Sequence, residues 1–207
     1  NILSTLNYHG ADESVLTDSQ PHIGTDKLSG IVQNIRETII SCGGEVHFNT
    51  KCIGLIKDDT QAVKGITTSD GRIISGEAVI MTAGHSAREV YTLLAENGAE
   101  LESKTFAMGV RVEHPRAEID SIQYHGKDPG DLGAASYRLA AQADGRGVYS
   151  FCMCPGGVIV PSATADDEIV VNGMSPSNRN TRWSNAAIVV EIQPEDVPEE
   201  FVLVANP

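Results

Sequence analysis

Long apolar runs are absent from this sequence. Its 207 residues are 41% hydrophobic, which is enough to build a core. No stretch approaches the ~20 consecutive apolar residues that a membrane-spanning helix needs. The N-terminus also lacks the basic segment followed by an apolar one that marks a secretion signal. We therefore expect a globular, cytoplasmic protein with no membrane contact.

Positive charge is scarce as well. The chain has 15 Lys and Arg against 28 Asp and Glu, a formal net charge of −13. This balance argues against a nucleic-acid groove or an anionic membrane surface as partner. The acidic residues gather in four short segments that we interpret as solvated surface, at 12–18, 96–102, 166–168 and 195–200. The expected partner is a small-molecule substrate, and the oligomeric state is left open.

Only four cysteines are present, at positions 42, 52, 152 and 154. They form no C-x-x-C unit, so neither a metal site nor a dense disulfide framework is expected. Cys42 and Cys52 fall in predicted elements and are interpreted as core residues. Cys152 and Cys154 are the candidates for chemistry. Alternate residues of a strand lie ~7 Å apart, so we do not expect these two to form a disulfide.

The stretch 151–179, FCMCPGGVIVPSATADDEIVVNGMSPSNR, has the densest chemistry in the chain. Its Pro-Gly-Gly and Asn-Gly-Met-Ser turns permit close approach of the backbone to a ligand. Thiol, amide, hydroxyl and guanidinium groups occur together there, which predicts a site. A reactive thiol needs a nearby cation, and the candidates are Arg179 at the end of this stretch and Arg182 just after it.

The first half of the chain predicts helices and a β-meander. Apolar residues at helical spacing predict a helix over 25–41, which the pair Gly43-Gly44 ends. A buried strand over 77–82 is expected to lead through a glycine turn into a second helix, with Ser86 and Glu89 as its capping box. The strands of the meander are expected at 46–48, 52–56, 62–68 and 72–74.

The second half predicts mainly strands. A short helix over 115–122 and a glycine-rich loop over 126–133 interrupt them. The strands are expected at 106–113, 136–141, 148–153, 158–160, 169–171 and 186–192, with a hairpin turn over 144–147. The fold class is therefore α+β or mixed α/β, and we place a boundary near residue 104, between segments 1–104 and 105–207.

Six segments between residues 21 and 192 together resemble one protein family. They read PHIGTDKL, MTAGHSAREVY, FAMGVRVEHP, FCMCPGG, NGMSPSNR and SNAAIVVEI. In this order they resemble bacterial FAD-dependent (NAD/FAD-utilising) dehydrogenases that are largely uncharacterised. These proteins are similar in architecture to glutathione-reductase-type flavoproteins, in which a β-rich substrate domain interrupts an FAD-binding α/β domain.

The resemblance implies an internal fragment of such an enzyme. Its relatives begin with a strand that leads into G-x-G-x-x-G, which admits the FAD pyrophosphate to a helix N-terminus. No G-x-G-x-x-G occurs in this sequence. Segment 1–104 then corresponds to part of the FAD-binding α/β domain with its β-meander, and 105–207 to part of the β-rich substrate domain. We expect FAD in the intact enzyme, with NAD(P) as an open second cofactor, and neither activity nor bound FAD in this chain alone.

The resemblance also implies residues that bind the cofactor. Cys52 and Ile53 would offer backbone groups to the adenine. The turn Thr82-Ala83-Gly84-His85 resembles the Ala-Thr-Gly-His of the family, with the first two residues in the opposite order. The loop Pro155-Gly156-Gly157 would face the flavin.

The same resemblance implies a substrate-side loop with Asn172, Ser175 and Arg179, where the arginine would hold a carboxylate. Cys152 and Cys154 are the candidate catalytic residues. The structural alternatives are a turn with a surface arginine and two packed thiols. For function, three hypotheses stay open: a fragment of an FAD-dependent oxidoreductase, a non-catalytic substrate-recognition or interaction module, and a thiol redox protein that uses Cys152 and Cys154.

Overall fold

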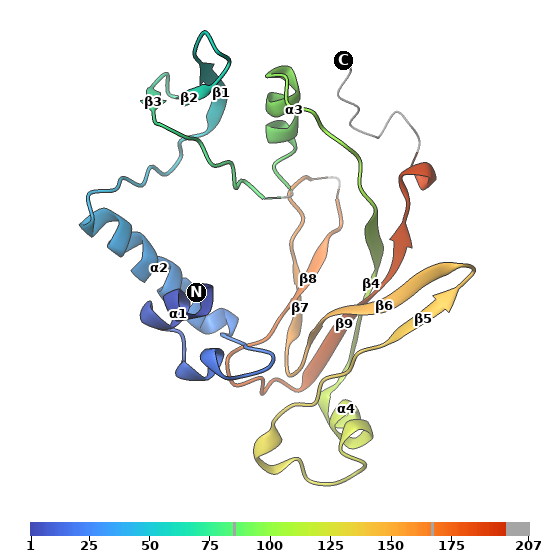
Figure 1. Ribbon diagram of the computed structural model, residues 1–207. Coiled ribbons are helices and arrows are strands. Elements are labelled where there is room, and N and C mark those ends of the chain that lie inside the picture. The colour runs from blue at the N-terminus through green and yellow to red at the C-terminus, as the bar shows by residue number, and fades with distance from the viewer. Residues whose placement is uncertain (85, 167, 198–207) are drawn as a thin grey trace. The chain divides into compact units, whose positions relative to one another are not determined.

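The computed structural model describes residues 1–84, 86–166 and 168–197 (Figure 1). It has a mixed α+β fold, and every pair of strands within the described residues is antiparallel. Contacts group the chain into two compact units. Among the described residues, the first unit contains 1–45 and 105–192, and the second contains 46–104 and 193–197. The expected boundary at residue 104 concerns the domains of a longer enzyme and stays a prediction.

Two helices and a short 3-10 turn begin the first unit. They are α1 (Ile2–Tyr8), η1 (Glu13–Leu16) and α2 (Thr25–Ser41). The predicted helix over 25–41 is confirmed as α2, and Gly43, with φ +85°, follows its end. Val15 and Ile31 are almost fully buried and hold α2 against η1. No helix in the described part of the chain is long and apolar enough to cross a membrane.

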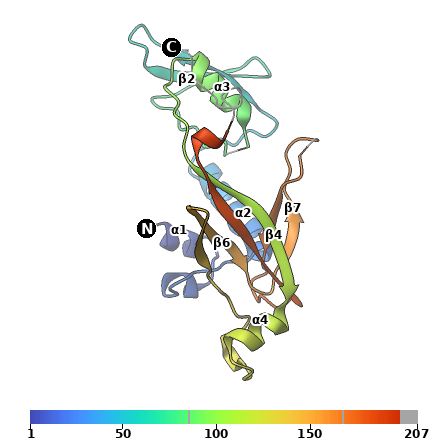
Figure 2. The ribbon, with the colours of Figure 1, turned by 90° about the vertical axis from the view of Figure 1, so that its right-hand side faces the viewer.

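The four-stranded sheet is the largest element of the first unit. Its strands are β4 (Phe106–Pro115), β5 (Ala140–Ala143), β6 (Arg146–Cys154) and β9 (Trp183–Ile192), in the order β4-β9-β6-β5. Figure 2 shows β4 beside β9, and the two strands pair along their full lengths. The predicted hairpin is confirmed, but its turn is shorter than the expected 144–147 and residues 136–139 form no strand. Asp144 and Gly145 both have positive φ, as a two-residue type I′ turn requires.

The remaining elements of this unit are α4 (Arg116–Gln123), η2 (Gly130–Leu132) and a two-stranded sheet of β7 (Val158–Pro161) and β8 (Val171–Met174). The predicted helix after Pro115 is confirmed. The expected turn at Asn172 is wrong, because Asn172 pairs with Val160 and Met174 with Val158. The turn expected at Asn172 is found instead after the end of β8, at residues 177–178.

The second unit contains the β-meander and one helix. They are β1 (Cys52–Lys57), β2 (Val63–Thr68), β3 (Ile73–Ser75) and α3 (Arg88–Glu96), with η3 (Pro194–Asp196) later in the chain. The strands predicted at 52–56, 62–68 and 72–74 are confirmed within a residue or two. The meander is thus predictable from alternation and turn residues.

Two predicted strands and one helix cap in this unit are wrong. Residues 46–48 and 77–82 form no strand. The side chain of Ile80 is 84% exposed, and 77–82 pairs with no described strand, so an apolar composition alone does not make this segment a strand. Ala87, not Ser86, is the N-cap of α3, and the Glu89 carboxylate instead lies 2.8 Å from Lys51 Nζ.

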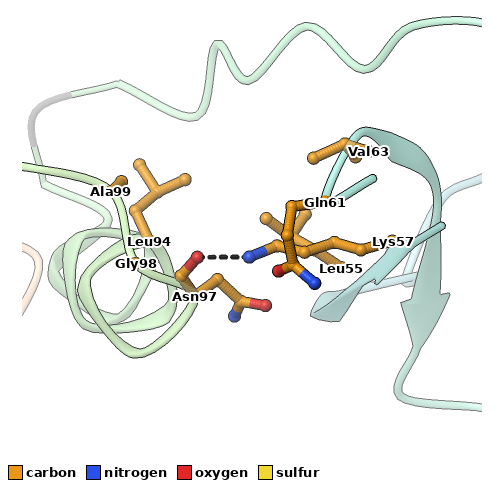
Figure 3. Close-up of a pocket in the computed structure, with 8 residues that line it drawn as sticks. All are labelled: Leu55, Lys57, Gln61, Val63, Leu94, Asn97, Gly98 and Ala99. Atoms are coloured by element: carbon orange, nitrogen blue, oxygen red, sulfur yellow. Dashed lines mark hydrogen bonds between the residues drawn. The ribbon is translucent and has the colours of Figure 1, made fainter. Parts of the chain in front are cut away.

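A lysine links the meander to the end of α3. Figure 3 shows the Lys57 side chain, whose Nζ donates a hydrogen bond to the carbonyl of Asn97, the C-cap of α3. A cation at a helix C-terminus satisfies a free carbonyl and is favoured by the helix dipole. An open pocket of about 450 Å³ lies around this contact, with Leu55 and Leu94 among its lining residues. We interpret it as part of the packing of α3 on the meander.

Candidate functional site

A second pocket, of about 530 Å³, lies in the first unit between the N-terminus of α2 and the ends of β6 and β8. Six residues expected at the site line it: Cys152, Cys154, Pro155, Asn172, Ser175 and Arg179. The other lining residues are Pro21, His22, Ile23, Gly24, Thr25, Leu28, Met153, Gly173 and Met174. We call this cavity the α2 pocket.

A β-bulge sets the direction of the two cysteines. On β6, Phe151 pairs with Ala187 and Cys154 pairs with Asn185, so β6 has one residue more than β9 in this interval. Cys152 has a φ of +44°, a left-handed conformation that is uncommon outside glycine. The regular alternation assumed from the sequence is therefore lost here. All four cysteines are free thiols; Cys42 and Cys152 are exposed, and Cys52 and Cys154 are half-buried. The expectation that Cys42 is a core residue is therefore wrong.

Arg111 of β4 is the cation beside the thiols. Its Nη2 donates hydrogen bonds to the Cys152 carbonyl at 2.5 Å and to Cys154 Sγ at 3.2 Å. Its Nε donates to Asn185 Oδ1 at 2.6 Å. Asn185 is completely buried, and its Nδ2 has no hydrogen-bond partner in the described part of the chain. Both side chains lie against Gly173, where a Cβ would overlap them.

Arg111 was not among the expected site residues, because the expected cations, Arg179 and Arg182, follow the cysteines closely in sequence. Arg182 is instead stacked on Trp183, with its guanidinium carbon 4.8 Å from the ring centroid. The available signal was a single basic residue inside the apolar run FAMGVRV of β4. A charge on a strand of a sheet is seldom left without a partner. That partner is a cross-strand neighbour, which periodicity does not identify.

Hydrogen bonds attach α2 to the loop after β8. The Ser175 carbonyl accepts from the Thr25 amide at 3.1 Å. The Asp26 carboxylate accepts from the Ser177 amide at 2.7 Å and from the Ser177 hydroxyl at 2.8 Å. Both bonds hold the pKa of Asp26 below its ordinary value, and the bond from the Ser177 hydroxyl has the larger effect. The loop thus fixes the position of the α2 N-terminus at the pocket.

The Ser175 hydroxyl is already used by the fold. Ser175 is 5% exposed, and its Oγ donates to the Pro155 carbonyl at 2.9 Å. Gly156 and Gly157 are buried behind the pocket and are not among its lining residues. A Cβ on Gly156 would overlap the Arg179 backbone, so this glycine permits two segments of the chain to pack closely.

Arg179 is an arginine that lines the pocket. It has a φ of +47°, and its Nε is buried with no hydrogen-bond partner in the residues that the structure describes. The N-terminus of α2 lies at the same pocket, where the Thr25 amide donates to the Ser175 carbonyl and the Lys27 amide to the Gly24 carbonyl. The guanidinium therefore favours an anionic or strongly polar acceptor as ligand.

The other expected cofactor residues lie in the second unit, and none of them lines the α2 pocket. Cys52 and Ile53 are on β1, where Ile53 is 55% exposed. Thr82, Ala83 and Gly84 are exposed and follow the segment that forms no strand. His85 lies outside the described residues. Within the described ranges, no cluster of His, Cys, Asp and Glu could hold a metal ion.

Comparison with known proteins gives two similarities. An uncharacterized protein of Clostridium beijerinckii is 41% identical to this chain over 198 residues. This alignment covers 94% of the chain but 37% of the relative, so the chain spans little more than a third of the length of that protein. Residues 105–205, which include β4 to β9 and the cysteine and arginine walls of the α2 pocket, match the family described as FAD-dependent protein, C-terminal domain-like.

Proposed function

We propose that this chain is a segment of an FAD-dependent oxidoreductase and that the α2 pocket faces the flavin and its substrate. One observation carries the proposal: the fold gathers Cys152, Cys154, Asn172 and Arg179 around one cavity. The family match of residues 105–205 to FAD-dependent proteins supports it. Catalysis, the substrate and a cytoplasmic location belong to the proposal.

The residues present fit part of such a ligand. The buried Arg179 Nε, which has no hydrogen-bond partner in the described residues, offers a donor to a carboxylate of the substrate or to the polar edge of the flavin. Asn172 lines the same wall and can add an amide donor or acceptor. Bound flavin supplies the electron transfer, and these side chains bind and orient the reactants. Ser175 positions Pro155 and does not have to touch the ligand.

The longer relative provides the test of flavin binding. We expect the Clostridium beijerinckii protein to be yellow on purification or after addition of FAD, and this 207-residue chain to stay colourless, because it has no G-x-G-x-x-G. A relative that takes up no flavin under either condition would contradict the proposal. Bleaching of the bound flavin by NADH or NADPH then decides whether a nicotinamide is its reductant.

The role of Arg179 is tested in the same longer protein, at the position that aligns with it. Replacement by methionine removes the guanidinium and keeps much of the side-chain length. We expect normal flavin absorbance and a fall of about tenfold or more in the rate of substrate-dependent flavin reduction. The matched control is the position of Arg182, which lies on Trp183 outside the pocket. Equal effects at both positions would remove Arg179 from the site.

A further inference from the structure

We propose that Cys154 is a reactive thiol that forms mixed disulfides with anionic small-molecule disulfides, and that Arg111 is its positioning residue. In this reaction the Cys154 sulfur attacks one sulfur of the ligand after its proton leaves to water. The ligand S–S bond breaks, a new S–S bond joins Cys154 to one half, and the other half leaves as a thiolate with the electron pair. The inference requires no flavin.

The surroundings of Cys154 carry the proposal. Reactive cysteines occur in electropositive, partly exposed places. Cys154 is half-buried in the wall of the α2 pocket, and a guanidinium N–H of Arg111 lies 3.2 Å from its sulfur. Arg111 is itself fixed, because Asn185 accepts from its Nε at 2.6 Å. The thiol is therefore held at one position beside a permanent positive charge.

Cys152 lacks this environment although it is the more exposed thiol. Arg111 contacts only its backbone carbonyl, and within the described residues no hydrogen bond reaches its sulfur. The left-handed backbone of Cys152 allows the carbonyl to meet Arg111. The structure therefore gives the two cysteines different tasks: Cys152 bends the strand, and Cys154 reacts.

An unsatisfied polar group in the pocket wall indicates that the pocket takes a ligand. Arg179 lines the α2 pocket, and its buried Nε has no hydrogen-bond partner in the described ranges. Buried donors without partners are rare in proteins and are usually satisfied by something bound. With Arg111 and Arg179 both cationic, the ligand that fits is anionic.

The experiment uses the 207-residue chain with Cys42→Ser and Cys52→Ser, so that only the two cysteines of interest react. The probes are DTNB, an aromatic disulfide with two carboxylates, and dithiodipyridine, which is uncharged. We expect DTNB to label Cys154 before Cys152. Cys154→Ser should abolish the fast phase, and Cys152→Ser should keep it. Faster labelling of Cys152, or equal rates in the two variants, would overturn the proposal.

Arg111→Met and Arg111→Lys test the positioning role. We expect methionine to slow the DTNB reaction of Cys154 about tenfold and the dithiodipyridine reaction less, since only the first reagent is anionic. Lysine should restore part of the DTNB rate. A general loosening of the structure would accelerate both reagents, and unchanged rates in a folded Arg111→Met protein would exclude Arg111. If Arg111→Met does not fold, Arg111→Lys and the serine variants still decide the outcome.

Discussion

Gly156 and Arg179 meet backbone to backbone, with φ angles of +54° and +47°. A Cβ at Gly156 would overlap the carbonyl group of Arg179. The turn after β6 therefore packs directly on the loop that carries the Arg179 guanidinium of the α2 pocket. The position of Arg179 depends on the absence of a side chain at residue 156.

Gly156→Ala should destabilise the protein more than a matched glycine variant. Gly145 also has a positive φ, of +77°, but has no atom within 4 Å of a Cβ position. We expect Gly145→Ala to cost about 1 kcal/mol, from the left-handed backbone alone. Gly156→Ala should cost roughly 2–4 kcal/mol, because overpacking adds to this strain. Urea unfolding measures both, and equal costs would show that the two backbones do not touch.

Cys152→Gly should preserve or increase stability, which is unusual for removal of a side chain. Glycine adopts the observed φ of +44° without steric strain, so we expect a gain of up to about 1 kcal/mol. Cys152→Val should lose about 1–2 kcal/mol, because a β-branched residue disfavours this conformation. Thermal unfolding of the two variants compares them directly. A valine variant as stable as the glycine variant would place residue 152 in an ordinary strand conformation.

The Asp26 tether should weaken only in acid. The pKa of Asp26 is lowered from 3.8 by the Ser177 hydroxyl and amide, so its contribution to stability is present above 3.8 and is lost as the pH falls through the lower folded value. The Ser177 amide proton, which donates to this carboxylate, should report the titration in NMR spectra. We expect its inflection below pH 3.8 and none in Asp26→Asn. An inflection at or above 3.8 would mean that the tether is absent in solution.

Asp70 should stabilise the turn between β2 and β3 into strong acid. Its carboxylate accepts from Arg72 Nε at 2.8 Å and from the hydroxyl of the buried Thr68 at 2.5 Å, and these bonds hold its pKa well below the ordinary range. The bonds therefore persist at neutral pH and are lost only when acid reaches the lowered value. Asp70→Ala should lower the melting temperature at pH 7 more than Asp59→Ala. Equal melting temperatures of the two variants would show that the hydrogen bonds of Asp70 do not stabilise the turn.

Local patterns predicted the elements well because each depends on neighbours in sequence. Apolar residues every three or four positions along 25–41 and the stop at Gly43 are sufficient to define α2. The alternation of 106–113 likewise identifies β4. Segment 77–82 failed, because strand formation requires a partner and composition does not supply one.

The sequence was sufficient to predict which segments form the site, but not which of their side chains are in contact. Cys152, Asn172 and Arg179 were expected together, and they line one pocket. The contact between Arg111 and Cys154 joins β4 to β6 across β9 and depends on one extra residue in β6. Cross-strand register sets such contacts, and a bulge shifts the register without a periodic signal in the sequence.

The attachment of α2 to the loop after β8 joins residues about 150 positions apart. During synthesis, α2 leaves the ribosome long before the loop that fixes its N-terminus. The growing chain therefore carries a finished helix without a pocket until residue 179 has emerged, and closing so long a loop makes the contact slow to form. A chain released before that point would lack Arg179, so the α2 pocket would remain incomplete.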